Sequence, residues 1–157
     1  MPRPVKIALA VLALAFVGMQ FVGPRRTNPV ADPALRLEAH ATVPTEVSTT
    51  LRRACYDCHS NETRWPWYSR VAPPAWLVAH DVEEGRGHLN FSRWGDYNPF
   101  DRADMLDDAC KEVRRGEMPL GPYLILHRDA RLSARDVETL CTWAAAEAAR
   151  LTSAATP

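Results

Sequence analysis

The sequence lacks a net charge of either sign, because 19 lysines and arginines balance 19 aspartates and glutamates. Residues 1–42 carry a net charge of +3 and the remainder carries −3. A nucleic-acid-binding domain needs a basic stripe or patch to meet the phosphate backbone, and a mildly acidic domain offers none. The composition therefore excludes DNA and RNA as partners.

The sequence also lacks a strand pattern and an internal repeat. Apolar residues recur at helical spacing in four segments, residues 45–58, 74–84, 101–115 and 133–151. We expect Asp101 to cap the third segment, and Ser133 and Asp136 to form a capping box at the start of the fourth. With 157 residues and 46% hydrophobic content, the chain has room for one domain of ordinary size. These features predict a small all-α domain.

Long apolar runs are scarce, and the one exception lies near the N-terminus. Residues 7–22 follow the basic Arg3 and Lys6 and contain Gln20 as their only strongly polar member. As a helix this run would extend roughly 24 Å, somewhat less than the roughly 30 Å of a bilayer core. It also lacks the small-residue cleavage site of a signal peptide. We therefore expect residues 1–24 to form an uncleaved transmembrane anchor helix, with the membrane as a partner.

The segment 25–43 is rich in proline, alanine and charge. Pro29 and Pro33 would interrupt a continuous helix, so we expect this segment to be a tether. The domain then covers residues 44–152, and residues 153–157 are expected to form a frayed tail.

Cysteine is scarce, with four residues in the chain, but two of them form the most informative motif. Cys55 and Cys58 lie one helical turn apart, and His59 follows directly. This spacing is typical of covalent haem attachment, in which each thiol adds to one vinyl group and the histidine ligates the iron. The alternative is a zinc site completed by His59 or by Cys110 and Cys141. The position of the histidine favours one covalently bound haem c and its iron.

A sixth iron ligand is expected about sixty residues downstream. Met118 lies in a turn between Gly116 and Pro119, and a thioether opposite an imidazole raises the reduction potential, as in electron-carrying cytochromes. The rival methionine, Met105, lies inside a helical pattern and is expected to pack. His80 is the alternative distal ligand, which would give bis-histidine ligation.

Three aromatic residues follow the cysteine motif. Trp65, Trp67 and Tyr68 lie in an expected loop, residues 61–74, and their flat apolar rings suit the face or edge of a porphyrin. Ordinary packing of aromatic side chains in the core fits the pattern equally well. We include the three residues among the candidate cofactor-binding side chains.

The other two cysteines, Cys110 and Cys141, each lie on the expected inner face of a helix. In an oxidising compartment two such thiols can form a disulfide, which requires Cα atoms within about 7 Å. The alternative is a pair of separate buried thiols, and the sequence leaves both open.

The chain resembles the bacterial haem-binding-domain proteins, a single-haem family related to cytochrome c. The resemblance covers about residues 44–145 and rests on the strings CYDCHSNETRWPWYSRVAPPAW, EGRGHLNFSRW, CKEVRRGEMPLGPYLILHRDARLS and ETLCTWA. It implies that Cys55 and Cys58 bind the porphyrin, that His59 is the proximal ligand and that Met118 is the distal one. Since covalent haem attachment takes place outside the cytoplasmic membrane, it also implies a domain that faces the periplasm.

The function that these features favour is a membrane-tethered monohaem electron carrier, not an enzyme, which exchanges electrons with an unidentified redox partner protein. A haem-based sensor in which a gas replaces Met118 needs the same residues. A peroxidase is less favoured, because the sequence contains no convincing distal histidine and arginine pair. A zinc-stabilised structural module is the alternative without haem.

Overall fold

The computed structural model describes residues 1–155, and over these residues the chain forms helices and connecting segments with no strand, which confirms the all-α prediction. The α-helices are α1 (Arg3–Met19), α2 (Leu37–His40), α3 (Thr45–Ala54), α4 (Tyr56–His59), α5 (Pro74–His88), α6 (Pro99–Arg115), α7 (Gly121–Leu126) and α8 (Ala134–Ala155). Four short 3₁₀ helices connect them: η1 (Pro33–Leu35), η2 (Trp67–Arg70), η3 (Phe91–Asp96) and η4 (Arg128–Ala130).

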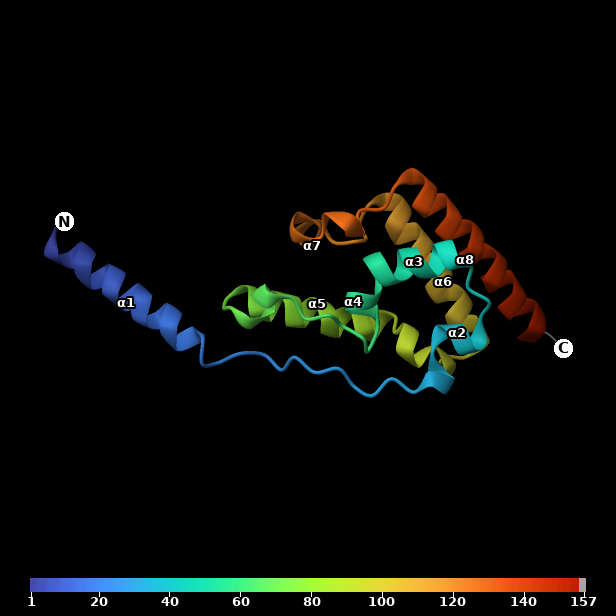
Figure 1. The fold of residues 1–157 in the computed structure, drawn as a ribbon, viewed down its shortest axis with the longest axis horizontal. Coiled ribbons are helices and arrows are strands. Elements are labelled where there is room, and N and C mark those ends of the chain that lie inside the picture. The colour runs from blue at the N-terminus through green and yellow to red at the C-terminus, as the bar shows by residue number, and fades with distance from the viewer. Residues whose placement is uncertain (156–157) are drawn as a thin grey trace.

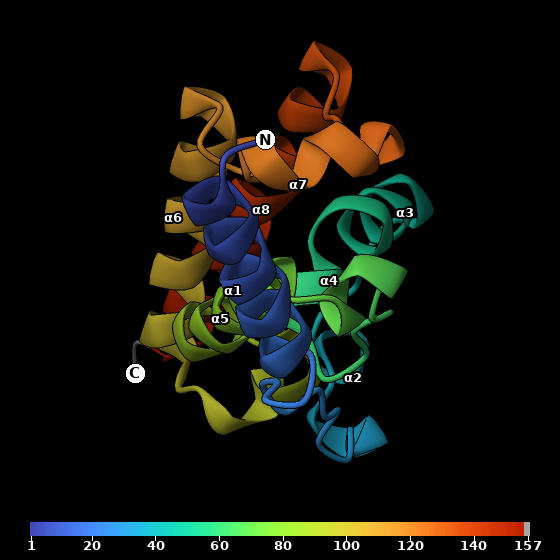
Figure 2. The same cartoon turned by 90° about the vertical axis from the view of Figure 1, so that its left-hand side faces the viewer.

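The core lies where α6 and α8 pack along each other, with α3 packed on α8 (Figures 1 and 2). The short helix α2 and η3 close the far end of the core, where Leu37 and Trp94 are fully buried. Further aliphatic members of the same cluster are Val47, Leu51, Leu106, Val113, Leu140 and Leu151. The helix pair α6 and α8 is therefore the scaffold against which the other elements are placed.

The ends of α6 show why that helix has its length. The side-chain oxygen of Asn98 accepts hydrogen bonds from the amides of Phe100 and Asp101, both at 3.0 Å. The expected cap at Asp101 is therefore wrong, because Asn98 caps the helix three residues earlier and Pro99 occupies its first turn. Gly116, at φ 73°, ends the helix in the left-handed conformation that glycine adopts most easily.

The capping box of α8 is confirmed. The Ser133 hydroxyl accepts a hydrogen bond from the Asp136 amide at 3.1 Å, and the Asp136 carboxylate accepts one from the Ser133 amide at 2.8 Å. α8 extends through Ala155, so residues 153–155 continue the helix where fraying was expected. The rest of the expected tail, residues 156–157, lies outside the described residues.

The predicted N-terminal anchor is wrong. α1 contains 17 residues, which extend about 26 Å at about 1.5 Å per residue, and it includes the charged Arg3 and Lys6. A bilayer core is about 30 Å thick. None of the helices within residues 1–155 is both long enough and apolar enough to cross a membrane.

The segment expected to be a tether is in contact with the domain. Its first part, residues 25–30, runs as an extended strap along the lower side of the domain in Figure 1. The Arg26 guanidinium donates to the Ser69 carbonyl at 3.0 Å, and the side-chain amide of Asn28 donates to the Thr63 carbonyl at 2.9 Å. Arg86 of α5 donates to the strap as well, at Thr27 and Asn28.

The second part of that segment belongs to the core. Leu37 of α2 is fully buried, and Ala41 and Val43 pack against the same cluster. The packed domain therefore begins at about η1 rather than at residue 44. Of the two prolines that suggested a linker, Pro29 lies in the strap and Pro33 is the first residue of η1.

Cys110 of α6 and Cys141 of α8 form a disulfide, which settles the alternative that the sequence left open. Their Cα atoms are 5.3 Å apart, within the range that a disulfide allows, and both residues are buried. The bond joins the two scaffold helices across a sequence separation of 31 residues.

Replacing both Cys110 and Cys141 by alanine should lower the free energy of unfolding by about 3–4 kcal/mol, because the unfolded chain regains the entropy of a loop of about thirty residues. Denaturant titration followed by circular dichroism measures the loss. A reducing agent should destabilise the wild type by a comparable amount and leave the double variant unchanged. A wild type that is insensitive to reductant would contradict a stabilising bridge.

Candidate functional site

The cysteine motif lies at the junction of α3 and α4. Cys55 separates the two helices, at φ −123° and ψ −39°, and α4 then carries Cys58 and His59 through a single turn. The amides of Cys58 and His59 both donate to the Cys55 carbonyl, at 3.1 and 2.9 Å. This turn holds the two thiols and the imidazole in one short, rigid segment, and neither thiol is in a disulfide.

The helix α5 packs on the motif at a glycine. A Cβ atom built on Gly85 would lie 2.9 Å from the Cys58 carbonyl oxygen and 3.1 Å from the Cys58 Cβ. Such contacts are too close for any side chain, so glycine is what allows α5 to approach α4. The helical spacing in the sequence ends at residue 84, but α5 continues through Gly85 to His88.

The imidazole of His59 is oriented by the end of α5. Its Nδ1–H donates to the Leu89 carbonyl at 3.1 Å, since a carbonyl can only accept. In the neutral ring this bond places the proton on Nδ1, so Nε2 carries the lone pair. Burial lowers the pKa of His59, which favours the neutral ring that a metal ligand requires. A histidine that donates one nitrogen to a backbone carbonyl and presents the other is the usual arrangement of a metal ligand.

The two thiols differ from those of redox-active cysteine pairs. Burial raises the pKa of Cys55 to about 12, and the neighbouring Cys58 adds to the effect. Burial raises the pKa of Cys58 to about 11, with contributions from the carboxylates of Asp81 and Asp57. Both thiols are therefore protonated at neutral pH, whereas catalytic disulfide oxidoreductases use a thiol with a lowered pKa.

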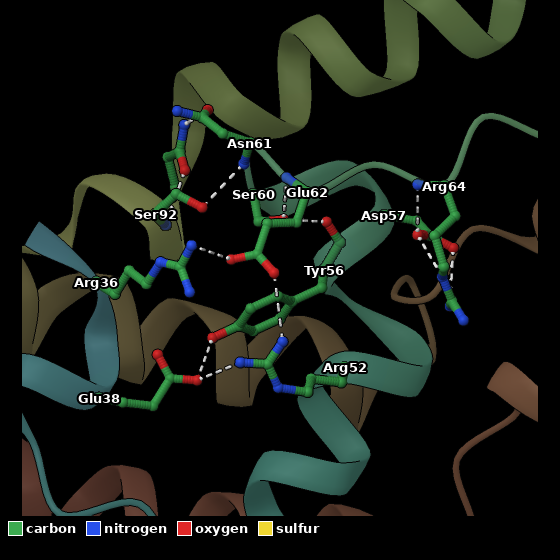
Figure 3. A network of polar contacts seen from close by, with 11 residues as sticks. Arg36, Glu38, Arg52, Tyr56, Asp57, Ser60, Asn61, Glu62, Arg64 and Ser92 are labelled. Atoms are coloured by element: carbon green, nitrogen blue, oxygen red, sulfur yellow. Dashed lines mark hydrogen bonds and ion pairs between the residues drawn. The ribbon is translucent and has the colours of Figure 1, made fainter. Parts of the chain in front are cut away.

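A polar network fixes the other side of α4 (Figure 3). The Tyr56 hydroxyl donates to Glu38 of α2 at 3.0 Å, and Arg52 donates to the same carboxylate oxygen at 2.9 Å. The Arg52 guanidinium also lies over the Tyr56 ring, 4.7 Å from its centre, and the ring stacks on Phe91 at 5.1 Å. These contacts hold Tyr56 against both α2 and η3.

The network continues into the segment after the motif, which Figure 3 also shows. The Ser60 hydroxyl donates to the Tyr56 carbonyl at 2.7 Å, and the Asn61 amide donates to the Ser92 hydroxyl at 3.0 Å. Ser60, Asn61 and Ser92 are buried. The position of α4 is thus set by hydrogen bonds at its end as well as by the packing of Gly85.

The candidate distal ligands differ in their surroundings. Met118 follows the end of α6, is half-buried and packs against the core cluster. Met105 also packs against that cluster, as expected. His80 is exposed on α5. Met118 therefore has the more constrained position, and its role as an iron ligand, with His80 as the alternative, stays a prediction.

The three aromatic candidates do not form one group. Trp65 donates its indole N–H to Asn28 of the strap at 3.1 Å, and Trp67 is 72% exposed. The Tyr68 hydroxyl lies 3.4 Å from Nδ1 of His127. Burial raises the pKa of Tyr68. His127 stacks in turn on Tyr123, whose hydroxyl donates to Asp57 between the two cysteines, so these contacts connect Tyr68 to the motif. Of the three, Tyr68 is the one that the structure brings to the candidate site.

The structure adds residues from α7 that the sequence did not suggest. The Tyr123 hydroxyl donates to Asp57, between the two cysteines, at 3.0 Å. Its ring stacks on His127 with centres 4.0 Å apart. In both views α7 lies on the opposite side of α4 from the strap (Figures 1 and 2). Asp57 and Tyr123 are 66 residues apart, so local sequence patterns carry no signal for their contact.

These residues fit a covalently attached haem. The motif offers two unbridged thiols one turn apart and an imidazole whose Nε2 carries a lone pair, and Met118 offers a half-buried thioether after the end of α6. The zinc alternative is weakened, because Cys110 and Cys141 are bonded to each other. Over residues 1–155 no three histidine, cysteine or acidic side chains gather in a set that could hold a metal ion.

Two glycines of α5 provide a test of this packing. Gly85→Ala should lower the free energy of unfolding by about 1–3 kcal/mol, because the added Cβ meets the Cys58 backbone. Gly87→Ala, two residues away, has nothing within 4 Å of its added Cβ and should stabilise by about 0.5–1 kcal/mol. Denaturant titration of the full chain measures both. Equal effects at the two positions would contradict the close approach of α4 and α5.

A model of the haem-binding domain family matches residues 14–146. Comparisons with curated proteins and with solved structures found no match. The matched range covers most of the chain and includes Cys55, Cys58, His59 and Met118. The chain therefore belongs to the haem-binding domain family and is a haem-binding protein.

Proposed function

We propose that the protein is an extracytoplasmic monohaem c-type cytochrome that carries single electrons. Cys55 and Cys58 would hold the porphyrin through thioether bonds, and His59 and Met118 would ligate the iron on its two sides. When bound, haem supplies an iron that takes up and releases one electron. We propose an electron carrier rather than an enzyme.

One observation carries this proposal: the hydrogen bond from Nδ1 of His59 to the Leu89 carbonyl, beside two free thiols. It leaves Nε2 available and fixes the ring before any ligand binds, which limits the reorganisation that ligation requires. A purely structural histidine would not need two unbridged thiols in the same short segment, and a zinc site on Cys55, Cys58 and His59 could not be completed by Cys110 and Cys141, which are bonded to each other.

The disulfide supports an extracytoplasmic location. Disulfides persist in oxidising compartments and are rare in the cytosol. Cys110 and Cys141 are bridged, and covalent haem attachment takes place outside the cytoplasmic membrane in the family that the chain resembles. We propose the periplasm or its equivalent, where the protein would exchange electrons with a redox partner protein.

A ligand-sensing module is the second candidate function. The observation that favours it is the weak attachment of α7, which follows Met118 and contains no buried residue. Segments with few buried contacts open at low free-energy cost. If the Met118 turn moved with α7, a small gas could reach the iron, and the protein would report its presence rather than carry electrons.

Covalent attachment is tested by producing the full chain together with the haem-attachment machinery. Haem staining after denaturing electrophoresis should show colour on the polypeptide, and acid acetone should not extract it, because thioether bonds survive denaturation. Cys58→Ala should abolish most of the staining. Thr49→Ser, on the exposed side of α3, is a control that should stain like the wild type. Colour that leaves the polypeptide would contradict the proposal.

The distal ligand is tested by comparing Met118→Ala with His80→Ala. Met118→Ala should remove the weak sulfur-to-ferric-iron charge-transfer band, lower the reduction potential and open the iron to carbon monoxide, while His80→Ala should do none of these. Absorption spectra and redox titration measure the outcome. The reverse pattern would show bis-histidine ligation. A wild type that already binds carbon monoxide rapidly would favour the sensing function.

A further inference from the structure

The helix α7 is held to the domain by few side chains. None of its residues is buried, and Ile125 and Leu126 are 70% and 60% exposed. The segments on either side are better anchored. Met118 packs on the core cluster before α7, and Ala130, which is fully buried, follows it. The position of α7 between these two better-packed segments therefore depends on the few contacts that its own side chains make.

The contact that joins α7 to α4 is the hydrogen bond from Tyr123 to Asp57, at 3.0 Å. Arg64 orients the acceptor, because its backbone amide and guanidinium donate three bonds to the Asp57 carboxylate, each at 3.1 Å. The Tyr123 ring also stacks on the His127 ring, with ring centres 4.0 Å apart. Nδ1 of His127 in turn lies 3.4 Å from the Tyr68 hydroxyl. A phenol on a fixed carboxylate is a charge-assisted hydrogen bond, stronger than a neutral one.

We propose that Tyr123 is a positioning residue whose hydrogen bond to Asp57 latches α7, and with it the Met118 turn, against the cysteine motif. This inference rests on the proposed ligation by His59 and Met118. Tyr123 follows Met118 by five residues, and Pro119 and Pro122 restrict the backbone between them. Movement of α7 away from α4 therefore pulls on the turn that carries the thioether.

The latch sets how often the distal side opens. Loss of the Tyr123 hydroxyl removes one charge-assisted hydrogen bond from the closed state and should raise the open population about tenfold, the factor that corresponds to about 1.4 kcal/mol. The closed arrangement keeps the Met118 sulfur in place, and the open one leaves the distal position accessible to a small ligand.

The experiment compares the full-length, haem-loaded wild type with Tyr123→Phe and Ser133→Ala. Ser133→Ala is the matched control, because it also removes a bond from a hydroxyl to a carboxylate, that of Asp136 at 2.7 Å, but at the start of α8. Tyr123→Phe should raise the association rate of carbon monoxide with the reduced protein about tenfold and weaken the sulfur-to-iron band. Hydrogen exchange of residues 121–126 should rise in parallel. Ser133→Ala should change none of the three.

Variants of Asp57 separate a latch from general destabilisation. Asp57→Asn keeps an acceptor oxygen but loses the negative charge, so its carbon monoxide rate should lie between those of the wild type and Asp57→Ala. Asp57→Ala, which removes the acceptor, should raise the rate at least as much as Tyr123→Phe. Adding Tyr123→Phe to Asp57→Ala should have no further effect, because the bond is already absent. Full additivity of the two substitutions would overturn the latch.

Two outcomes separate the latch from the proposed ligation. If Tyr123→Phe leaves the carbon monoxide rate and the exchange of residues 121–126 unchanged while the wild type keeps its charge-transfer band, the latch is wrong and Met118 ligation stands. If the wild type lacks the band, the ligation is wrong and the latch, as stated, is overturned with it.

Discussion

The close approach of α4 to α5, where Gly85 meets Cys58, is the constraint on which the site depends. It fixes the register of the two helices, because Leu89 follows Gly85 by four residues, about one helical turn, and His59 follows Cys58. The same register therefore brings the Leu89 carbonyl to His59 Nδ1. Any side chain at Gly85 would separate the helices and also misplace the carbonyl that orients the imidazole. The polar network around Tyr56 holds the opposite side of α4, so the motif is fixed before a cofactor binds.

Features that depend on a few consecutive residues could be predicted from the sequence. The spacing of Cys55, Cys58 and His59, the capping box at Ser133 and the all-α class are of this kind, since each follows from helical periodicity or from one turn of backbone. The local signal for the start of α6 was ambiguous, because two possible capping residues lie close together in the sequence. Asn98 and Asp101 are both good caps, and Pro99 decides for Asn98 because proline is favoured in the first turn.

Contacts between distant segments could not be predicted, because nothing in the pattern of one segment records its partner. Asp57 meets Tyr123 across 66 residues, and Leu37 reaches the core from a segment whose prolines suggested a linker. The aromatic residues show the same limit. Three aromatic residues are nearly adjacent in sequence but differ in their surroundings. Trp65 contacts the strap, Trp67 is exposed and Tyr68 contacts His127. The N-terminal run is a different case, because apolar composition suggested a span that its 17-residue helix lacks the length to make.

The disulfide between Cys110 and Cys141 also determines which two cysteines of the chain keep free thiols. A polypeptide with four cysteines has three ways to form two pairs, and only one of these leaves Cys55 and Cys58 for each other. The packing of α6 on α8 brings Cys110 and Cys141 together, so folding of the scaffold removes two competitors. The remaining two thiols are protonated and slow to exchange, since a thiolate is the species that attacks a disulfide. The scaffold bond therefore protects Cys55 and Cys58 from mispairing as the chain folds.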